Sequence, residues 1–232
     1  MTTISDNLQQ VRNRISKACT DVGRSIDSVN LLAVSKTFGP EAVRAAHAAG
    51  QLAFGENYIQ EGVEKILALS DLRLEWHCIG PIQSNKTRLV ASHFDWVQSV
   101  DRLKIAQRLS DQRPNSLDAL NVCIQVNIDG GITKSGVPAA EVLPLARQIL
   151  VLPRLCLRGI MCIPDPAVNQ SAQSAPLLMA RELFNALNRE GLHLDTLSMG
   201  MSSDLEAAVK SGSTMVRVGS AIFGTRDYAA KT

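Results

Sequence analysis

The stretch NLLAVSK, residues 30–36, is an apolar run of strand length that ends in a single amine, the side chain of Lys36. Just beyond it the chain turns at Gly39 and Pro40 and enters a segment of helical character. Lysine is poorly suited to the interior of a strand. At the carboxyl end of a strand in an alternating β/α chain, its amine can enter an active-site mouth and form a Schiff base. The stretch therefore predicts a parallel strand followed by a crossover helix, with Lys36 as a candidate reactive lysine.

The same alternation continues along the chain on the carboxyl side of this stretch. Short β-rich runs such as VCIQV (122–126) and MVRV (215–218) are separated by segments with apolar residues at helical spacing. Such an order implies parallel strands joined by crossovers, and eight strands favour closure of the sheet. The expected strands are 30–36, 51–55, 74–79, 94–99, 119–128, 155–163, 195–199 and 214–219. The expected helices that follow them are 40–49, 57–69, 83–91, 101–112, 138–150, 174–190 and 203–211.

One further helix precedes this alternating region. Leu8, Val11 and Ile15 recur at helical spacing after the candidate caps Ser5 and Asp6, which predicts a helix over residues 5–21. The length of 232 residues is near that of one barrel. We therefore predict an α/β fold, a single (β/α)8 TIM barrel with an extra N-terminal helix, that forms one domain over residues 1–232. An open, doubly wound sheet is the alternative architecture.

The composition limits the classes of partner. Hydrophobic residues make up 45% and charged residues 20% of the chain, as in ordinary soluble proteins. The net charge is only +2 and has no basic stripe, so we expect no nucleic-acid partner. We find no apolar run of membrane-spanning length and no signal peptide, and expect a cytoplasmic protein without membrane association. The five cysteines lack metal-ligand spacing, and most of them are expected to be buried thiols.

The residues that follow the expected strands are unusually polar. In a barrel these residues gather on one face, where active sites are built. The polar set consists of Lys36, the segment 55–58, His77, Gly80, Gln98, Ser99, Asn127, the segment 198–204, Arg217, Gly219 and Ser220. Residues 164–171, after the sixth strand, are polar and proline-bearing, and indicate either a mobile loop on this face or a tolerated surface insertion.

The segments SMGMSSD (198–204) and RVGS (217–220), which follow the last two strands, form a candidate phosphate site. Small residues let backbone N–H groups approach an anion, and serine hydroxyls supply further donors. Ser202 or Ser203 can also cap the helix that begins near Asp204. A lysine on the first strand opposite a phosphate site matches pyridoxal 5'-phosphate, whose aldehyde and phosphate lie on opposite flanks of its ring.

Arg217 lies between Val216 and Val218, so its side chain is expected to point the opposite way, into the barrel mouth. There it can donate to the pyridine nitrogen of the cofactor. A permanently cationic guanidinium disfavours protonation of that nitrogen and makes the ring a weaker electron sink. The alternative role of Arg217 is an ion pair with a carboxylate.

Other polar and aromatic residues allow more than one interpretation. Asn57 can orient the ring oxygen of the cofactor or cap the helix that begins near Tyr58. His77 is interpreted as a hydrogen-bonded barrel residue rather than a general acid or base. Trp76 and Trp96 are expected to pack outside the barrel against helices.

Several longer motifs resemble one known family, the YggS/PROSC-type pyridoxal phosphate homeostasis proteins, over essentially the whole chain. These motifs are LLAVSKT (31–37), FGENY (54–58), WH (76–77), IGPIQSNK (79–86), SMGMS (198–202) and VRVGSAIFG (216–224). The resemblance implies the barrel of the alanine racemase N-terminal domain. It also implies that Lys36 forms the aldimine, that Arg217 faces the pyridine nitrogen and that Asn57 lies near the ring. Ser202, Gly219 and Ser220 would then surround the phosphate, and Met201, from the same segment, is a further expected cofactor-binding residue.

Three functions are compatible with this pattern. The resemblance implies a protein of vitamin B6 homeostasis that binds pyridoxal phosphate without established turnover; we expect a monomer, with apo-enzymes as possible recipients. The chain stops about a dozen residues after the eighth strand, so we expect it to lack the second domain that brings a tyrosine base to alanine racemases. The alternative is a low-activity racemase or lyase with Lys36 and either His77 or Tyr58 as bases. A phosphosugar isomerase without the cofactor is the third possibility.

Overall fold

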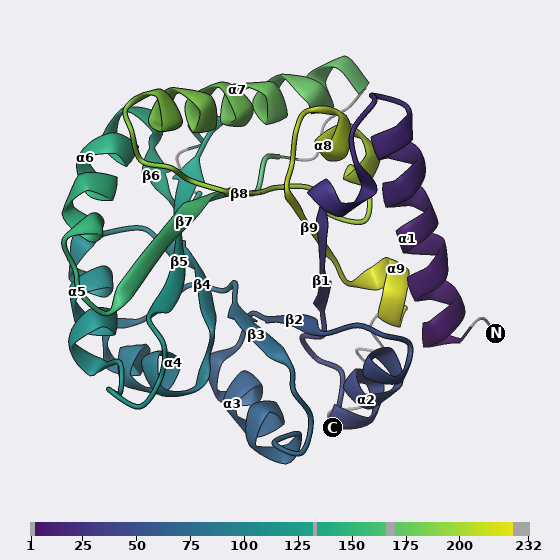
Figure 1. The fold of residues 1–232 in the computed structure, drawn as a ribbon, viewed down its shortest axis with the longest axis horizontal. Coiled ribbons are helices and arrows are strands. Elements are labelled where there is room, and N and C mark those ends of the chain that lie inside the picture. The colour runs from purple at the N-terminus through teal and green to yellow at the C-terminus, as the bar shows by residue number, and fades with distance from the viewer. Residues whose placement is uncertain (1–2, 132–133, 166–169, 225–232) are drawn as a thin grey trace.

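Eight parallel strands close into a barrel in the computed structural model, which describes residues 3–131, 134–165 and 170–224 (Figure 1). Around the barrel the order is β4-β3-β2-β1-β9-β8-β7-β5, and pairing of β4 with β5 completes the ring. The predicted (β/α)8 barrel is therefore confirmed, and the open sheet is excluded. The barrel strands are β1 (Asn30–Val34), β2 (Ala53–Glu56), β3 (Glu75–Cys78), β4 (Trp96–Val100), β5 (Leu120–Asn127), β7 (Leu155–Cys162), β8 (Thr196–Ser198) and β9 (Met215–Val218).

A further short strand, β6 (Val137–Pro138), was not predicted. It pairs in parallel with the end of β5, Val126 with Val137 and Asn127 with Pro138. A helix was predicted from residue 138, whereas the helix α6 begins one residue later, at Ala139. Proline fits this junction because it lacks an N–H and tolerates an extended backbone just before a helix.

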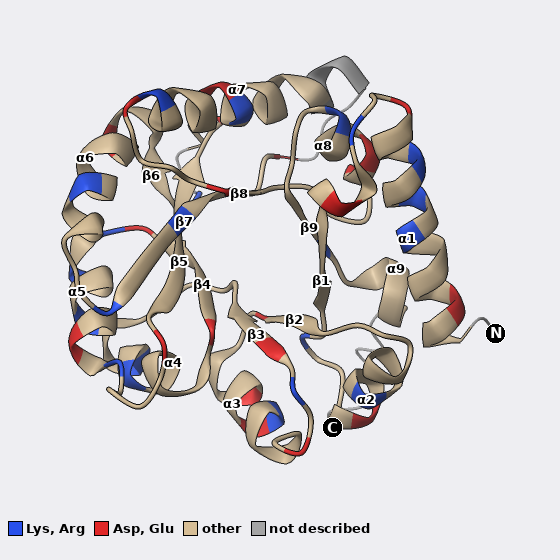
Figure 2. Ribbon diagram, in the orientation of Figure 1, with Lys and Arg blue, Asp and Glu red and all other residues tan. Residues whose placement is uncertain are grey.

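The helices form a ring outside the barrel, with charged residues of both signs spread over them (Figure 2). Their ends differ by a few residues from the predicted ranges, as is usual for frayed helix termini. The crossover helices are α2 (Pro40–Ala48), α3 (Ile59–Ala68), α4 (Thr87–His93, after the 3-10 turn Ser84–Lys86), α5 (Leu103–Gln112), α6 (Ala139–Leu150), α7 (Gln170–Arg189) and α8 (Leu205–Lys210).

The extra helix α1 (Ile4–Thr20) packs against α2, α8 and the last helix α9 (Ser220–Phe223). Its cap is Thr3, not Ser5. The Thr3 hydroxyl accepts from the Asp6 N–H at 3.1 Å, and the Asp6 carboxylate accepts from the Thr3 N–H at 3.0 Å. This reciprocal capping box satisfies two N–H groups at once, which a cap at Ser5 would not do. The Asn7 amide donates to the Ile222 carbonyl at 2.9 Å, so α1 also anchors the chain beyond β9.

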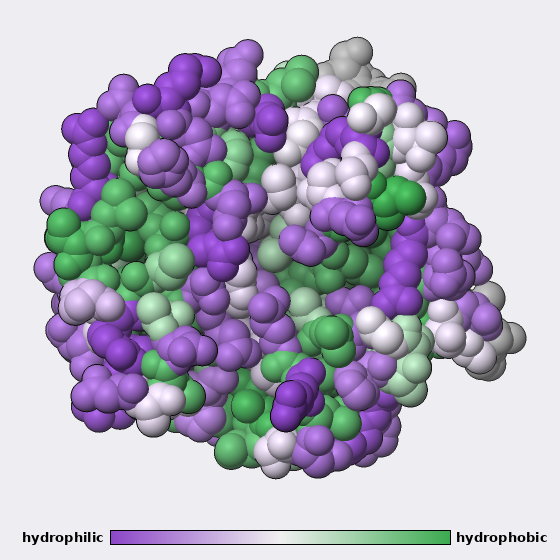
Figure 3. All heavy atoms as spheres, viewed as in Figure 1, coloured by the Kyte–Doolittle hydropathy of each residue, from purple (hydrophilic) through white to green (hydrophobic). Residues whose placement is uncertain are grey.

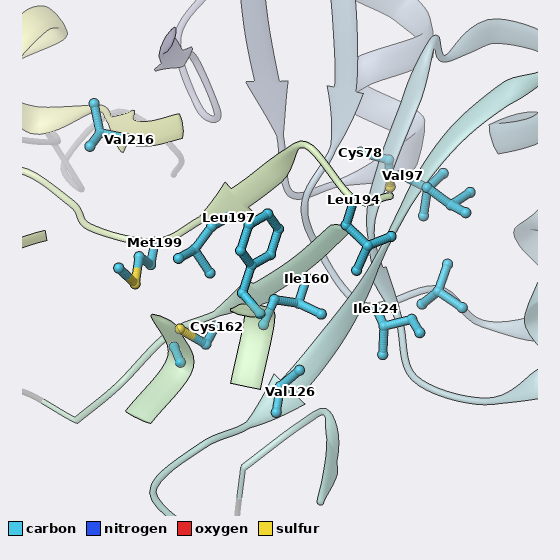
Figure 4. Close-up of a cluster of buried hydrophobic side chains, with 14 of the residues drawn as sticks. Cys78, Val97, Ile124, Val126, Ile160, Cys162, Leu194, Leu197, Met199 and Val216 are labelled. Atoms are coloured by element: carbon cyan, nitrogen blue, oxygen red, sulfur yellow. The ribbon is translucent and has the colours of Figure 1, made fainter. Parts of the chain in front are cut away.

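Alternate strand residues point to opposite sides of the barrel wall. Outward-facing residues form the main hydrophobic core beneath the helices; Figure 4 shows Val97, Ile124, Ile160, Leu197 and Val216 in this layer. Inward-facing residues include a small cluster of Trp96, Cys123 and Met161. The barrel interior therefore has a small apolar cluster of its own, separate from the layer around it.

The prediction for Trp96 was wrong, whereas that for Trp76 was right. Trp76 packs outside the barrel near Phe54, with ring centroids 5.7 Å apart. Trp96 lies inside and stacks on His77, with centroids 5.0 Å apart and planes 13° apart. Because Val97 takes the outward position on β4, its neighbour Trp96 must face inward.

Four of the five cysteines are buried, as expected, whereas Cys156 is exposed. Burial raises the pKa of the thiols of Cys78, Cys123 and Cys162 to about 12, so these thiols stay protonated and unreactive. Within the described ranges, no helix is long and apolar enough to cross a membrane. On the face that Figure 3 shows, hydrophobic residues form separate patches among hydrophilic ones.

Candidate functional site

A cavity of about 620 Å³ opens at the carboxyl ends of the barrel strands. Its lining brings together all seven residues that the sequence analysis expected in a cofactor site. These residues are Lys36, Asn57, Met201, Ser202, Arg217, Gly219 and Ser220. Five apolar or small residues that complete the wall were not predicted as site residues: Val34, Phe38, Ile79, Ile163 and Gly224. Ser203 also lines the cavity; it belongs to the segment 198–204 that was predicted as a phosphate site, with helix capping as its other role.

Lys36 lies two residues beyond the end of β1, and the residues on both sides of it are held from outside the barrel. The Ser35 carbonyl accepts from Lys65 Nζ at 2.8 Å, and the Ser35 hydroxyl donates to Glu56 Oε1 at 2.6 Å. The Thr37 N–H donates to Glu61 Oε1 at 2.5 Å. Thr37 adopts φ 70°, a left-handed conformation that is rare for a β-branched residue. These contacts fix the backbone from which the Lys36 side chain enters the cavity.

The group that holds these neighbours is a buried ionic cluster between β2 and α3. Lys65 Nζ lies 2.8 Å from Glu56 Oε1 and 2.7 Å from Glu61 Oε1. The Lys65 and Glu56 side chains are only 5% and 0% exposed. Burial raises the pKa of Glu56, although the nearby Lys65 ammonium opposes this shift. Sequence reasoning missed the cluster because a Glu–Lys pair four residues apart is typical of an exposed helix face.

Arg217 points into the barrel mouth from β9, as predicted, and is 4% exposed. Its Nη1 donates to the Ser198 hydroxyl at 2.7 Å, and its Nη2 donates to the Cys162 carbonyl at 2.8 Å. Both acceptors are uncharged. Among the described residues, no carboxylate forms an ion pair with Arg217, so its alternative role is not adopted.

The segments after β8 and β9 meet at the other side of the cavity. The Ser220 hydroxyl donates to the Ser202 hydroxyl at 3.2 Å. The N-cap of α8 is Asp204, so neither Ser202 nor Ser203 occupies the capping position. Gly200 has φ 96°, and a Cβ atom there would lie 2.4 Å from the Ala208 Cβ. Only glycine therefore lets this segment pass close against α8 and bring its serines to the cavity.

Asn57 also lines the cavity, and it does not cap a helix. The N-cap of α3 is Tyr58, whose side chain makes no capping bond. A Cβ atom at Gly80 would lie 2.0 Å from the Asn57 carbonyl oxygen. The turn after β3 thus crosses directly over the Asn57 backbone, which explains why glycine stands at position 80 and fixes where Asn57 lies.

Neither candidate second base lines the cavity. His77 is completely buried; its Nε2 lies 2.8 Å from Glu75 Oε1 and its Nδ1 lies 2.9 Å from Gln98 Nε2. This confirms the interpretation of His77 as a hydrogen-bonded barrel residue, and burial lowers its pKa. Tyr58 is 55% exposed and is not among the described lining residues.

Two other expected features of this face are absent from the described residues of the cavity wall. Asn127 is not a described lining residue; its amide donates to the Gly131 carbonyl at 2.9 Å. Of the polar loop predicted at residues 164–171, residues 166–169 lie outside the described ranges. Ile163, just before that loop, contributes an apolar contact to the cavity.

The donor set suits a small molecule with an electrophilic carbon on one flank and an anion on the other. Lys36 supplies an amine, Ser202 and Ser220 supply hydroxyls, and Arg217 supplies a fixed cation between neutral acceptors. The apolar lining residues leave room for a planar ring. Pyridoxal 5'-phosphate has these features, so the residues present fit the cofactor.

Comparison with known proteins agrees with this geometry. The model of the alanine racemase N-terminal domain family matches residues 3–227. A pyridoxal phosphate homeostasis protein of Pseudomonas aeruginosa is 56% identical over 230 residues, which is 99% of each chain. The chain belongs to the pyridoxal phosphate homeostasis family. A member from Escherichia coli is 53% identical over the full length of both chains.

Solved structures place this family member in the same fold group. PipY of Synechococcus elongatus, solved with PLP bound, is 35% identical with a TM-score of 0.80, and covers 92% of this chain and 100% of its own. An alanine racemase of Clostridium difficile is only 15% identical, yet has a TM-score of 0.76 over 98% of this chain and 59% of its own. The latter likeness shows that the family shares the barrel of the racemases.

Proposed function

We propose that this chain binds pyridoxal 5'-phosphate in the carboxyl-end cavity and serves to hold and hand on the cofactor. The observation that carries the proposal is the convergence of Lys36, Arg217 and the Ser202–Ser220 pair in one cavity. When bound, the cofactor supplies an aldehyde that condenses with the Lys36 amine to give a carbon–nitrogen double bond and water. The names of the relatives and the PLP-bound PipY structure support the choice of cofactor.

The other residues of the site have positioning roles in this proposal. Arg217 faces the pyridine nitrogen, and Asn57 lies beside the ring. Ser202, Gly219 and Ser220 surround the phosphate, and Met201 closes the wall next to them. The apolar contacts exclude water from the ring and limit hydrolysis of the covalent bond.

The proposal assigns binding rather than turnover to the protein. Racemisation needs a proton carrier on each face of the ring. Of the candidates raised from the sequence, Lys36 lines the cavity, whereas His77 and Tyr58 do not. If pure protein exchanged the α-hydrogen of an amino acid with deuterium, and Lys36→Ala abolished this exchange, the enzymatic alternative would hold instead.

The proposed function also leads to inferences about the compartment, the oligomeric state and the partners of the protein. We infer that it acts in the cytoplasm as a monomer and that its recipients are cofactor-requiring enzymes in their apo form. Mixing cofactor-loaded protein with such an apo-enzyme should restore that enzyme's activity faster than the spontaneous release of the cofactor allows. Equal rates would mean that free cofactor, rather than direct transfer, serves the recipient. Light scattering gives the oligomeric state.

The test of binding uses absorbance and chemical trapping. Purified protein is incubated with pyridoxal 5'-phosphate, separated from the excess, scanned, reduced with borohydride and mapped by mass spectrometry. We expect a visible band and a label on Lys36, with both lost in Lys36→Ala and retained in Lys17→Ala, which removes a lysine whose side chain is 78% exposed. A label elsewhere, or no band in the wild type, would overturn the proposal.

A further inference from the structure

A line of polar side chains crosses the barrel interior from the cofactor cavity to the opposite end. Arg217 Nη1 lies 2.7 Å from the Ser198 hydroxyl, which lies 2.6 Å from Gln98 Oε1. Gln98 Nε2 lies 2.9 Å from His77 Nδ1, and His77 Nε2 lies 2.8 Å from Glu75 Oε1. Barrel interiors are mostly filled by branched aliphatic side chains. A continuous polar path through this interior therefore needs an explanation.

The two ends of the path determine the direction of every hydrogen bond in it. Arginine can only donate, and an ionised carboxylate can only accept. Each group between Arg217 and Glu75 must therefore accept on the arginine side and donate on the glutamate side. Ser198 accepts from Arg217 and donates to Gln98, and the Gln98 amide donates to His77. His77 must then carry its proton on Nε2, facing Glu75.

One further contact and the burial of His77 agree with this direction. Gln98 Nε2 also lies 3.1 Å from Met215 Sδ, an acceptor that would repel the amide oxygen if the amide were reversed. The reverse path would need a doubly protonated His77, whereas complete burial lowers the pKa of this imidazole and keeps it neutral. Every bond thus points from Arg217 toward Glu75.

The middle of the path is held rigidly. Ser198, Gln98 and His77 are each 0% exposed. The His77 ring stacks on Trp96, and the Arg158 guanidinium lies 4.8 Å from the Trp96 ring on the amino-end side of the barrel. Side chains packed in this way cannot turn to other partners without opening the barrel core. A change at one end of the path must therefore be taken up along it.

We propose that Ser198, Gln98, His77 and Glu75 are positioning residues for Arg217. The position of the Arg217 guanidinium, which faces the cofactor ring, then depends on contacts that reach the opposite end of the barrel. The proposal rests on the proposed function, because its effect on a ligand concerns the pyridoxal 5'-phosphate site. The described lining residues of that site do not include Gln98, His77 or Glu75. Any effect they have on bound cofactor must travel through Ser198 and Arg217.

The first measurement needs no cofactor. In the wild-type protein, nitrogen-15 NMR of the histidine side chains reports which ring nitrogen of His77 is protonated. We expect Nε2 protonated and Nδ1 unprotonated for the signals that disappear in His77→Gln. Protonation on Nδ1 would overturn the proposal whether or not the protein binds pyridoxal 5'-phosphate, because the path would then be broken at Gln98.

The second measurement uses the cofactor-loaded protein. Ser198→Ala and Gln98→Met interrupt the path, and each should raise the dissociation constant of pyridoxal 5'-phosphate about fivefold to tenfold and shift its visible band. Glu75→Gln removes the terminal charge, and it should shift the band with a smaller change in affinity. The matched control is Ser110→Ala, which removes a buried hydroxyl of α5 that accepts from the Arg154 N–H at 3.4 Å, away from both the path and the cavity.

The outcomes separate this inference from the proposed function. Failure of the wild type to bind the cofactor would overturn the proposed function and leave the His77 measurement standing. Wild-type affinity and spectrum in Ser198→Ala, Gln98→Met and Glu75→Gln, with folded protein by circular dichroism, would overturn the positioning role. Equal spectral shifts in Ser110→Ala and Glu75→Gln would overturn it as well, since the effect would then be general to the core.

Discussion

The two ends of the barrel contain cavities of nearly equal size, about 620 Å³ at the carboxyl ends of the strands and about 660 Å³ at the amino ends. Size therefore does not identify the site. At the amino end Arg158 and Asp195 pair with one another, and the Glu75 carboxylate accepts from the neutral His77 ring. Arg158 lies 2.6 Å from Asp195, and Glu75 lies 2.8 Å from His77. At the carboxyl end the described partners of Arg217 are neutral oxygens, and small residues and hydroxyls form the opposite wall.

This difference shows how one barrel separates stability from function. Charges that satisfy one another contribute to the fold and leave little for a ligand to neutralise. A cation held between neutral acceptors still has an unneutralised charge to offer an electron-rich ring nitrogen. The strained backbone at Thr37, beside Lys36, is likewise at the carboxyl end, where the buried cluster of Lys65, Glu56 and Glu61 holds it.

The largest difference between the ends should appear in stability. Lys65→Met leaves the Glu56 carboxylate buried without its cation, and we expect a loss of about 3–5 kcal/mol in the free energy of unfolding. The matched change at the amino end, Asp195→Asn, breaks a pair whose side chains are 32% and 54% exposed, and should cost less than about 1 kcal/mol. Urea denaturation measures both. Equal losses would mean that the cluster beside Lys36 is not specially buried.

Substitutions at the two ends should also have very different effects on the affinity for the cofactor. Lys36→Ala removes the covalent bond, and should raise the dissociation constant of pyridoxal 5'-phosphate at least about a hundredfold. Arg158→Met removes a cation of the amino-end cavity and should change that constant by less than about twofold. Equilibrium dialysis measures both constants. If Arg158→Met lost as much affinity as Lys36→Ala, the cofactor would bind at the amino end, and the proposed site would be wrong.

The loss of folding stability at low pH should depend on His77, in the amino-end half of the barrel interior. Burial lowers the pKa of folded His77 below its ordinary value of 6.5. Below pH 6.5 the unfolded chain therefore binds a proton that the folded chain does not, and this group's contribution to stability falls with the pH. One such proton corresponds to a slope of about 1.4 kcal/mol per pH unit.

Urea denaturation at pH 7.5 and pH 5.5 measures this slope. We expect His77→Gln to lose less stability on acidification than the wild type, whereas His193→Gln, at an exposed histidine, should keep the wild-type slope. Identical slopes for all three proteins would show that His77 is protonated in the folded state as readily as in the unfolded one.

The smallest expected effect concerns single hydroxyls. Ser220→Ala removes a donor from the candidate phosphate site and should raise the dissociation constant of pyridoxal 5'-phosphate about fivefold. Ser28→Ala, which removes a hydroxyl from the amino-end cavity, should leave that constant unchanged. Competition with inorganic phosphate checks the assignment. If Ser220 binds the phosphate group, the inhibition constant of inorganic phosphate should also rise in Ser220→Ala.

Much of this arrangement could be predicted from the sequence because it depends on order along the chain. Strand-length apolar runs separated by helical patterns gave all eight barrel strands. The rule that strand ends share one face then brought Lys36, Arg217 and Ser220 together from distant parts of the chain. These predictions needed no knowledge of how individual side chains pack.

The features that sequence reasoning missed depend on register and packing. Trp96 was placed outside the barrel because the sequence of β4 does not show which of its faces is outward. Its register partners, His77 on β3 and Asn121 on β5, fix that direction in the structure. Lys65 was missed because a lysine in a helix is usually solvent-exposed, and only the position of Glu56 beneath it makes burial tolerable. The path from Arg217 to Glu75 joins four strands, so no local spacing reveals it.

The central claim is that the carboxyl-end cavity, and not the amino-end one, is the cofactor site. A crystal structure of the protein grown with pyridoxal 5'-phosphate tests this most directly. We predict electron density continuous with Lys36 Nζ, with the ring nitrogen beside Arg217 and the phosphate beside Ser202 and Ser220. Cofactor density in the cavity lined by Glu75 and Arg158, or density joined to another lysine, would contradict the account.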